Sequence, residues 1–264
     1  DVMKKVALVS ASAGLAVLTA LGFSQQAVMA QTSTAATPQP AMSSTVNRAE
    51  VEAIIKDYLI KNPEVLLEAQ AALSAKQEAS QQQAQGQVIS QNHDKLFNSS
   101  LDAVFGNPKG DVTVVEFFDY NCGYCKRALP DMDALLKSDP KLRFVMKEFP
   151  ILGPDSTKAH IVAKAFKALM PEKYLEFHRD LLGRDGRATE DAAMQIAVKL
   201  GGNEKAIREK MKSPDIAQAF QQNYDLANAL NINGTPSYII GNEVVPGALG
   251  ADALAEKISH IRNK

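Results

Sequence analysis

The chain has 264 residues, with 29 lysines and arginines against 30 aspartates and glutamates, so its formal net charge is −1. A near-neutral chain without a run of basic residues offers no electrostatic reason to bind nucleic acid or an anionic membrane surface. The chain has only two cysteines and no tryptophan. A zinc ribbon needs a second Cys or His pair at ligand spacing, and since the sequence has none, we expect no metal site of that kind.

Residues 1–30 have the pattern of an export signal. Lys4 and Lys5 precede an apolar, alanine-rich run over 6–23, and small residues lead up to Ala30. The alternative is an uncleaved membrane anchor, but the run is short for the roughly 20 apolar residues of a spanning helix. We therefore expect cleavage after about Ala30 and export to the periplasm.

Residues 31–45 carry no charge and few bulky side chains, so we expect a flexible tail there. A helical N-terminal extension is predicted over 46–98, with Asn47 as a capping residue and an apolar stripe at helical spacing. Its stretch 74–87 is rich in Ala and Gln and indicates either a solvated helix or a loose linker. The stripe could pack on the chain's own main domain, but we favour association between copies. The stripe includes Val51, Ile54, Ile55, Leu59 and Leu66.

The main domain is predicted over 99–264 and belongs to the α/β class. Compact apolar runs at 112–118 and 142–149 flank a helical pattern at 126–137, an order that implies two parallel strands. The long stretch 156–231 has only helix signals, which indicates a helical insertion. Later signals predict a hairpin of strands at 237–240 and 243–245 and a closing helix at 251–261.

The two cysteines form the motif Cys122-Gly123-Tyr124-Cys125, between a predicted buried strand and a helix. As a structural disulfide the pair would remove only about 2 kcal/mol of unfolded-chain entropy, against about 3 for a 15-residue loop. At the helix N-terminus the first thiol meets unpaired N–H groups and the positive end of the helix dipole, which lower a thiol pKa. We therefore predict a redox pair, with Cys122 exposed and attacking and Cys125 buried and resolving.

Three segments in order, VVEFFDYNCGYC, KEFP and GTPSYIIG, resemble the bacterial DsbA-type branch of thioredoxin-fold proteins over roughly residues 100–264. The resemblance implies a thioredoxin fold with an inserted helical domain, and no cofactor. It places the catalytic cysteines at Cys122 and Cys125, a cis-proline at Pro236 and a buried acid at Glu116. Dithiol/disulfide exchange on cysteines of exported proteins, with a membrane redox partner, would be the activity.

Four residues are candidates for substrate contact: Gly123, Tyr124, Thr235 and Pro236. A proline has no N–H, so Pro236 ahead of a strand can leave a backbone edge open for a substrate strand. Glu116 interrupts an apolar strand and has two interpretations. It accepts protons from Cys125 during exchange, or it pairs with a base such as Lys147 on the neighbouring strand.

Two features depart from the DsbA pattern. That branch has Pro-His between its cysteines, whereas Gly123-Tyr124 has no cation to stabilise a thiolate, so we expect a weaker oxidant. Gly-Tyr, and threonine before the proline, resemble DsbC-type isomerases, and the layout resembles the suppressor-of-copper-sensitivity C proteins. We expect an isomerase or reductase that forms homo-oligomers through its extension. The alternatives are a net disulfide oxidase and a copper-handling dithiol protein or chaperone.

The four histidines are far apart in the sequence, at His93, His160, His178 and His260. Each is most simply a surface residue or a structural residue with its hydrogen bonds satisfied. The methionines form no cluster suited to copper. The chemistry predicted from the sequence therefore depends on the two cysteines and the acid that precedes them.

Overall fold

A computed structural model of the chain describes residues 47–263, so the predicted signal at 1–30 and the predicted tail at 31–45 lie outside the described residues. The described residues divide into two units, one that ends at Tyr58 and one that begins at Leu59. Within 47–263, no helix combines the length and the apolar character that crossing a membrane requires.

The helical extension begins with α1 (Arg48–Lys61), where the Asn47 side chain accepts a hydrogen bond from the Ala49 N–H at 3.1 Å. This is the capping role predicted for Asn47. The side chains of Ile54 and Ile55 in α1 are 66% and 51% exposed. The predicted apolar stripe is therefore helical, and these two side chains are largely open to solvent.

Helix α2 (Glu64–Gln91) is continuous over 28 residues, so the stretch 74–87 is a solvated helix and not a linker. Leu66 and Leu73 in its first half are exposed, whereas Ile89 near its end is fully buried. The short helix α3 (His93–Phe97) follows and buries Leu96. The last turns of α2, and α3 through Leu96 and Phe97, thus pack on the hydrophobic core of the main domain.

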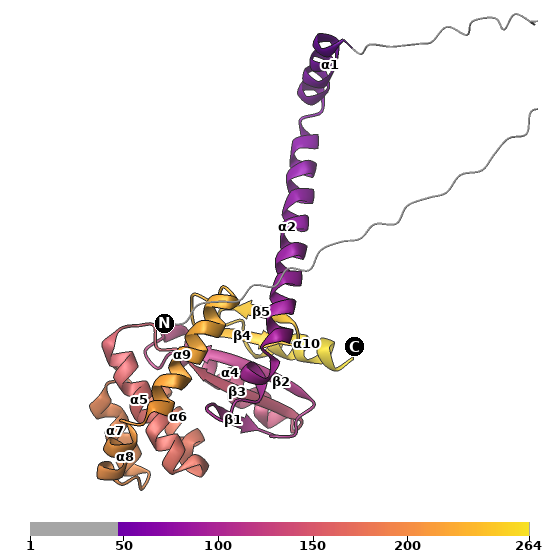
Figure 1. Cartoon of the computed structure of the whole chain (residues 1–264). Coiled ribbons are helices and arrows are strands. Elements are labelled where there is room, and N and C mark those ends of the chain that lie inside the picture. The colour runs from indigo at the N-terminus through magenta and orange to yellow at the C-terminus, as the bar shows by residue number, and fades with distance from the viewer. Residues whose placement is uncertain (1–46, 264) are drawn as a thin grey trace, which may run out of the picture. The chain divides into compact units, whose positions relative to one another are not determined.

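The main domain is built on a five-stranded sheet with the strand order β1-β3-β2-β4-β5 (Figure 1). The parallel pairing of β2 and β3 confirms the strand–helix–strand prediction, and β4 and β5 form the predicted hairpin. The sequence did not predict β1, which pairs antiparallel with β3, because it has only four residues and just two of them are buried. The strands are β1 (Ala103–Gly106), β2 (Val112–Phe118), β3 (Leu142–Glu148), β4 (Ser237–Ile240) and β5 (Glu243–Pro246).

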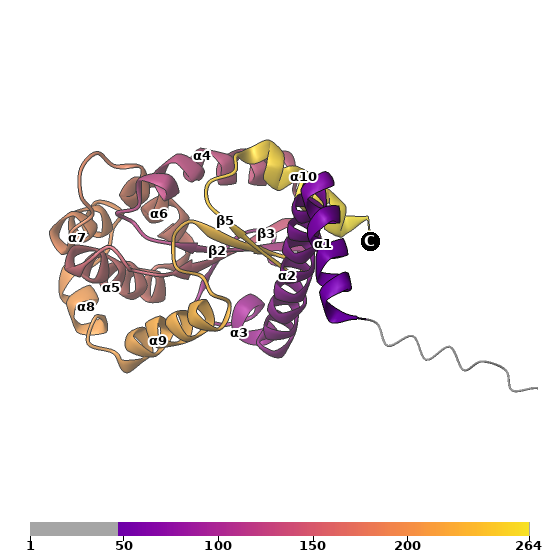
Figure 2. The same cartoon turned by 90° about the horizontal axis from the view of Figure 1, so that it is seen from above.

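Helices cover both faces of this sheet (Figure 2). Helices α4 (Gly123–Ser138) and α10 (Ala251–Arg262) lie on the face that carries Val114 and Phe118 of β2. The opposite face, which carries Val115 and Phe117, packs against α3, the end of α2 and α9 (Pro214–Ala229). Because strand side chains alternate between faces, a shift of one residue in β2 exchanges the environments of its side chains.

The predicted helical insertion follows β3. Its first helix begins at Pro154, two residues before the predicted start, because proline suits the first helical position. Thr189 and Asn203 each accept a hydrogen bond from a backbone N–H in the first turn of the helix that follows. The insertion comprises α5 (Pro154–Leu169), a short 3₁₀ turn (Pro171–Lys173), α6 (Tyr174–Gly183), α7 (Glu190–Lys199), α8 (Glu204–Lys210) and α9.

Candidate active site

The two cysteines lie where β2 gives way to α4. Cys122 is the N-cap residue of α4, with extended backbone angles, and its N–H donates to the Asp119 carbonyl at 3.0 Å. Its own carbonyl accepts from the Lys126 N–H at 3.0 Å, which closes the first turn of the helix. Cys125 lies inside that turn, and both thiols are free. This placement agrees with the prediction that the motif lies at a strand-to-helix junction.

The local environment separates the two thiols chemically. A hydrogen bond from the Cys125 thiol is the main cause that lowers the pKa of Cys122 to about 5. The Thr235 side chain and the N–H groups of Cys125 and Tyr124 lower it further, while burial opposes them. Burial raises the pKa of Cys125 far above its usual value. Cys122 is therefore a thiolate near neutral pH and Cys125 a thiol.

One expectation about Cys122 was wrong, because only 6% of the residue is exposed. The loop that precedes β4 covers it: Cys122 Sγ lies 3.0 Å from the Thr235 carbonyl oxygen, to which the thiol donates when it is protonated. The Thr235–Pro236 peptide bond is cis, as the resemblance implied. The fold thus brings Thr235 and Pro236 against the cysteine motif, whereas Tyr124 stays 59% exposed beside it, with the Arg127 guanidinium 4.2 Å from its ring centroid.

Glu116 lies on β2 opposite Tyr238 of β4, on the same sheet face as α4. It is 3% exposed, and burial raises the pKa of its carboxyl to about 8, with the charges of Cys122 and Asp131 acting in the same direction. Within residues 47–263, no lysine, arginine or histidine forms an ion pair with it. The suggested pairing with Lys147 was wrong, because Lys147 stands opposite Phe117 and points to the other face, where it binds Asp102.

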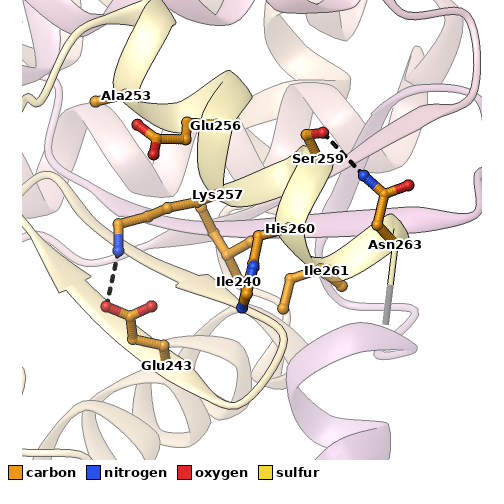
Figure 3. Close-up of a pocket in the computed structure, with 9 residues that line it drawn as sticks. All are labelled: Ile240, Glu243, Ala253, Glu256, Lys257, Ser259, His260, Ile261 and Asn263. Carbon is orange, nitrogen blue, oxygen red and sulfur yellow. Dashed lines mark hydrogen bonds and ion pairs between the residues drawn. The ribbon is translucent and has the colours of Figure 1, made fainter.

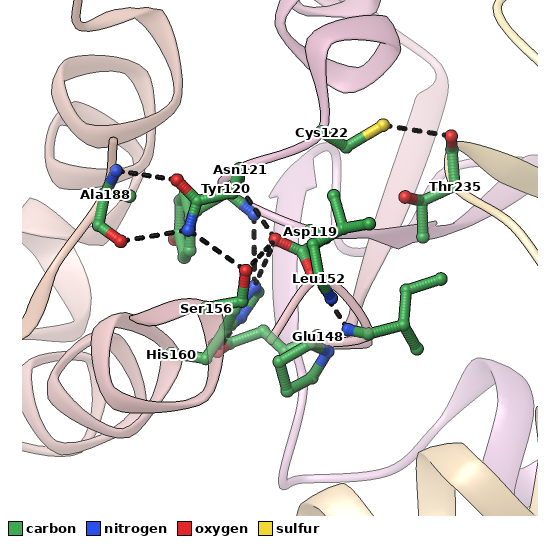
Figure 4. A network of polar contacts seen from close by, with 12 residues as sticks. Asp119, Tyr120, Asn121, Cys122, Glu148, Leu152, Ser156, His160, Ala188 and Thr235 are labelled. Carbon is green, nitrogen blue, oxygen red and sulfur yellow. Dashed lines mark hydrogen bonds and ion pairs between the residues drawn. The ribbon is translucent and has the colours of Figure 1, made fainter. Parts of the chain in front are cut away.

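A polar network beside the motif involves residues that sequence reasoning missed (Figure 4). The buried Asp119 carboxylate accepts a hydrogen bond from the Ser156 hydroxyl of α5 at 2.8 Å. One turn further along α5, His160 Nε2 accepts from the Tyr120 N–H at 3.1 Å, and its Nδ1 lies 2.7 Å from Glu148. An acid just before the first cysteine was the only available signal, because its partners come from a distant helix.

Two histidines predicted to be independent meet in this region. His160 and His178 are both fully buried, and both lie against the rings of Phe118 and Tyr120. Burial lowers the pKa of His178 to about 3. His178 Nδ1 lies 3.3 Å from the Tyr120 hydroxyl. His93 and His260 are surface residues, as predicted. The buried pair is structural in character but borders the redox motif.

One hollow in the described part of the chain lies away from the cysteines. It measures about 700 Å³ and is bounded by one side of α10 and the turn between β4 and β5 (Figure 3). Lys257 and Glu243 form an ion pair at 2.9 Å across it. In residues 47–263, no group of three His, Cys, Asp or Glu side chains is placed to hold a metal ion. The chemically distinctive site is therefore the cysteine motif.

Comparison with known families agrees with this geometry. Residues 113–259 match the model of the DSBA-like thioredoxin domain, a span that includes both cysteines, Glu116 and Pro236. The chain belongs to the DSBA-like thioredoxin domain family. The predicted thioredoxin fold with its helical insertion is thereby confirmed. Residues 47–80 match the N-terminal domain of the copper resistance protein ScsC, so the layout close to ScsC is also confirmed.

Two solved structures are similar to most of the chain. A thioredoxin-like oxidoreductase from Silicibacter pomeroyi is 40% identical, with a TM-score of 0.63, over 66% of this chain and 99% of that one. BcfH of Salmonella enterica Typhimurium is 30% identical, with a TM-score of 0.66, over 80% of this chain and 94% of that one. The second match extends beyond the DsbA-like domain into the helical extension.

Curated relatives differ in how much of their length is matched. Disulfide bond formation protein D of Bacillus subtilis is 25% identical over 171 residues, which cover 59% of this chain and 74% of that protein. Two Na(+)/H(+) antiporters of Salinispora species also match, but this chain spans only 24% of their length. The matched part in those antiporters is thus one segment of a longer chain.

Proposed function

We propose that the protein is a thiol–disulfide oxidoreductase that exchanges disulfides with cysteines of exported proteins. The observation that carries the proposal is the contrast between two thiols three residues apart, one with a pKa of about 5 and the other far above its usual value. Family membership and the export-signal pattern of residues 1–30 support both the chemistry and a periplasmic location.

In the reductive direction, the Cys122 thiolate attacks one sulfur of a substrate disulfide. The substrate S–S bond breaks, a mixed disulfide forms at Cys122, and the other substrate sulfur leaves as a thiolate and takes up a proton. Cys125, once deprotonated, attacks the Cys122 sulfur and releases the second substrate thiol. The enzyme ends with a Cys122–Cys125 disulfide, and two electrons have passed to the substrate.

The second step needs a proton acceptor for Cys125, and Glu116 is our candidate. The charge of Glu116 raises the pKa of Cys125, so the two groups are close enough to interact. The Glu116 side chain lies on the sheet face that is covered by α4, the helix that carries Cys125. With a pKa of about 8, the Glu116 carboxyl is partly ionised near neutral pH, and its ionised form is a stronger base than an ordinary carboxylate, so it is better suited to accept the Cys125 proton. Gly123, Tyr124, Thr235 and Pro236 would contact the substrate strand around the attacking sulfur.

The chemistry is tested by two single substitutions. Cys125→Ser leaves the attacking thiolate without a resolving thiol, so mixed disulfides with substrate proteins should accumulate on Cys122. Cys122→Ser should trap little and abolish exchange, because the remaining thiol is buried and protonated. Trapped complexes are counted on non-reducing gels after acid quenching. Equal trapping by the two variants would contradict the assignment.

For the direction of exchange we propose isomerase or reductase, with net oxidase as the alternative. Gly123-Tyr124 has no imidazole between the cysteines, and each 1.4 kcal/mol of lost thiolate stabilisation lowers oxidising power by about 30 mV. Thiol trapping of the protein in intact cells separates the two roles. A mostly reduced pair supports isomerase or reductase, and a mostly oxidised pair would point to an oxidase and its membrane redox partner.

We further propose that the N-terminal helices join copies of the chain. Leu66, Leu67 and Leu73 in the first half of α2 are 57%, 69% and 56% exposed. The other end of the same helix is packed in the core through Ile89. A second copy presents the same apolar stripe, and helix pairing would remove both from water. Several Cys122 sites around one substrate would raise the effective thiol concentration for isomerisation.

The test keeps the chain whole, because removal of residues before 98 would also remove Ile89 and Leu96 from the core. A Leu66→Glu, Leu73→Glu variant should run as a monomer in light scattering and refold a scrambled substrate poorly, while it still reduces disulfides. Gln70→Glu on the same helix is the control for added charge. A wild-type chain that is monomeric at micromolar concentration would refute the proposal.

A further inference from the structure

The side chain of Asp119 is completely buried, yet all of its hydrogen-bonding capacity is used. Oδ1 accepts from the Asn121 N–H and from the Ser156 hydroxyl, both at 2.8 Å. Oδ2 accepts from the N–H groups of Ile151 and Leu152 at 2.8 and 2.9 Å. Four donors surround this carboxylate. Only a group that has a hydrogen-bond acceptor at both oxygen positions can satisfy them.

The backbone of the same residue meets both cysteines. The Asp119 carbonyl accepts from the Cys122 N–H at 3.0 Å, and its N–H is hydrogen-bonded to the sulfur of Cys125. A movement of Asp119 therefore moves the attacking and the resolving groups together. Its side chain decides where this backbone lies, because it ties the residue to two other segments, residues 151–152 and α5.

Those segments are parts of the chain that would otherwise be independent. Tyr120 N–H is held by His160 of α5, and the Asn121 side chain exchanges hydrogen bonds with both the N–H and the carbonyl of Ala188, at 2.8 and 2.9 Å. Ser156 and His160 lie one turn apart on α5, so both face the same loop (Figure 4). Every residue from 119 to 121 is thus bonded to the helical insertion, just before Cys122.

We propose that Asp119 is a positioning residue for the redox pair: its carboxylate fixes the loop that carries Cys122 to the 151–152 segment and to α5. The inference deepens the proposed exchange function and rests on it. It assigns the helical insertion a role in holding the attacking sulfur against Thr235, besides that of covering the sheet.

An amide in place of the carboxylate cannot satisfy this site. In one orientation of Asp119→Asn, the NH₂ group faces the two N–H groups of Ile151 and Leu152. In the other orientation it faces the N–H of Asn121, although the Ser156 hydroxyl can then accept from it. Two donors face each other in both cases, so the loop must shift.

The experiment compares Asp119→Asn, Ser156→Ala and wild type at a temperature at which circular dichroism shows all three folded. One readout is the pH midpoint of Cys122 alkylation, and the other is kcat/KM for reduction of a disulfide peptide. We expect Asp119→Asn to raise the midpoint by about one pH unit, since a displaced loop weakens the hydrogen bonds to the thiolate. We also expect kcat/KM to fall by about tenfold or more, since a misplacement near 1 Å can cost 100-fold.

Ser156→Ala removes one donor and leaves the carboxylate. It should therefore lower kcat/KM by about threefold and raise the alkylation midpoint by less than Asp119→Asn does. It also serves as the test if Asp119→Asn fails to fold. Asp180→Asn, which breaks an exposed ion pair with Lys199 in the insertion, is the control and should change neither readout. Loss of thermal stability in the Asp119 and Ser156 variants, with wild-type midpoint and kcat/KM, would overturn the positioning role. Absence of exchange in wild type would instead refute the proposed function, and the alkylation midpoint would still report on Asp119.

Discussion

Two buried charges on adjacent strands of the sheet are held in opposite ways. On one face, Lys147 is fully buried and donates to the Asp102 carboxylate at 2.5 Å and to the Lys95 carbonyl. On the other face, Glu116 is almost as deeply buried, beside the redox motif, and has no ion-pair partner in residues 47–263. The two residues are on adjacent strands, yet they belong to different environments.

The difference shows how a fold can use ionisable groups for separate purposes. A buried cation with a close carboxylate holds one arrangement of the chain, because loss of either partner leaves an unpaired charge. A buried carboxyl without a cation keeps its proton near neutral pH and can exchange it. The partnered charge is thus structural, and the unpartnered acid is suited to chemistry next to Cys125.

Removal of the Asp102 carboxylate, the partner of Lys147, should have the largest effect on stability. Asp102→Ala leaves Lys147 buried without its partner, and removal of one member of a buried pair costs about 3–5 kcal/mol. The free energy of unfolding is measured by urea titration. Asp133→Ala, which breaks an exposed pair with Arg179, is the control and should cost no more than about 1 kcal/mol. Similar losses of stability in the two variants would contradict the structural role of the buried Asp102–Lys147 pair.

The next prediction concerns Glu116 and how its titration changes the stability of the fold with pH. The pKa of Glu116 is about 8 in the folded chain and 4.5 in an ordinary carboxyl, so between these values the unfolded chain ionises it and the folded chain does not. The contribution of Glu116 to wild-type stability should therefore fall as pH rises from about 4.5 to about 8, by up to about 1.4 kcal/mol per unit, and then level off. The lowered pKa of Cys122 acts in the opposite direction over much of this range, so the contribution of Glu116 is measured as the difference between a variant and wild type.

Glu116→Gln has no proton to lose, so it should lack this fall. The stability difference between variant and wild type should be small below pH 4.5, grow across the window and stay constant above pH 8. The rate of Cys125 reaction in the variant should also lose its dependence on a group that titrates near pH 8. Glu256→Gln, at an exposed position on α10, is the control. Parallel stability profiles for wild type and Glu116→Gln would contradict the interpretation.

The features that could be predicted from the sequence are those that depend on residues close together in the chain. The runs at 112–118 and 237–240 are the strands β2 and β4 with the predicted bounds, and the cysteine motif lies at the predicted junction. The suggested partner of Glu116 failed because it depends on strand register: Glu116 stands opposite Met146, and Lys147 one residue later faces the other way. Asp119 was missed for a related reason, since its donors come from the 151–152 segment and α5.

The smallest predicted effect tests whether the low pKa of Cys122 depends on the Thr235 side chain or on Glu116. The Glu116 charge does not stabilise a neighbouring thiolate, whereas the Thr235 side chain lowers the pKa of Cys122 by a hydrogen bond. Thr235→Val keeps the shape of the side chain and removes the hydroxyl, so the alkylation midpoint of Cys122 should rise from about 5 by about one unit. Thr157→Val on α5, whose hydroxyl bonds only the Gly153 carbonyl, should leave the midpoint unchanged. Glu116→Gln should not raise it, because removal of a nearby negative charge favours the thiolate. A rise in Glu116→Gln but not in Thr235→Val would mean that Glu116, and not the Thr235 hydroxyl, sets the reactivity of the attacking cysteine.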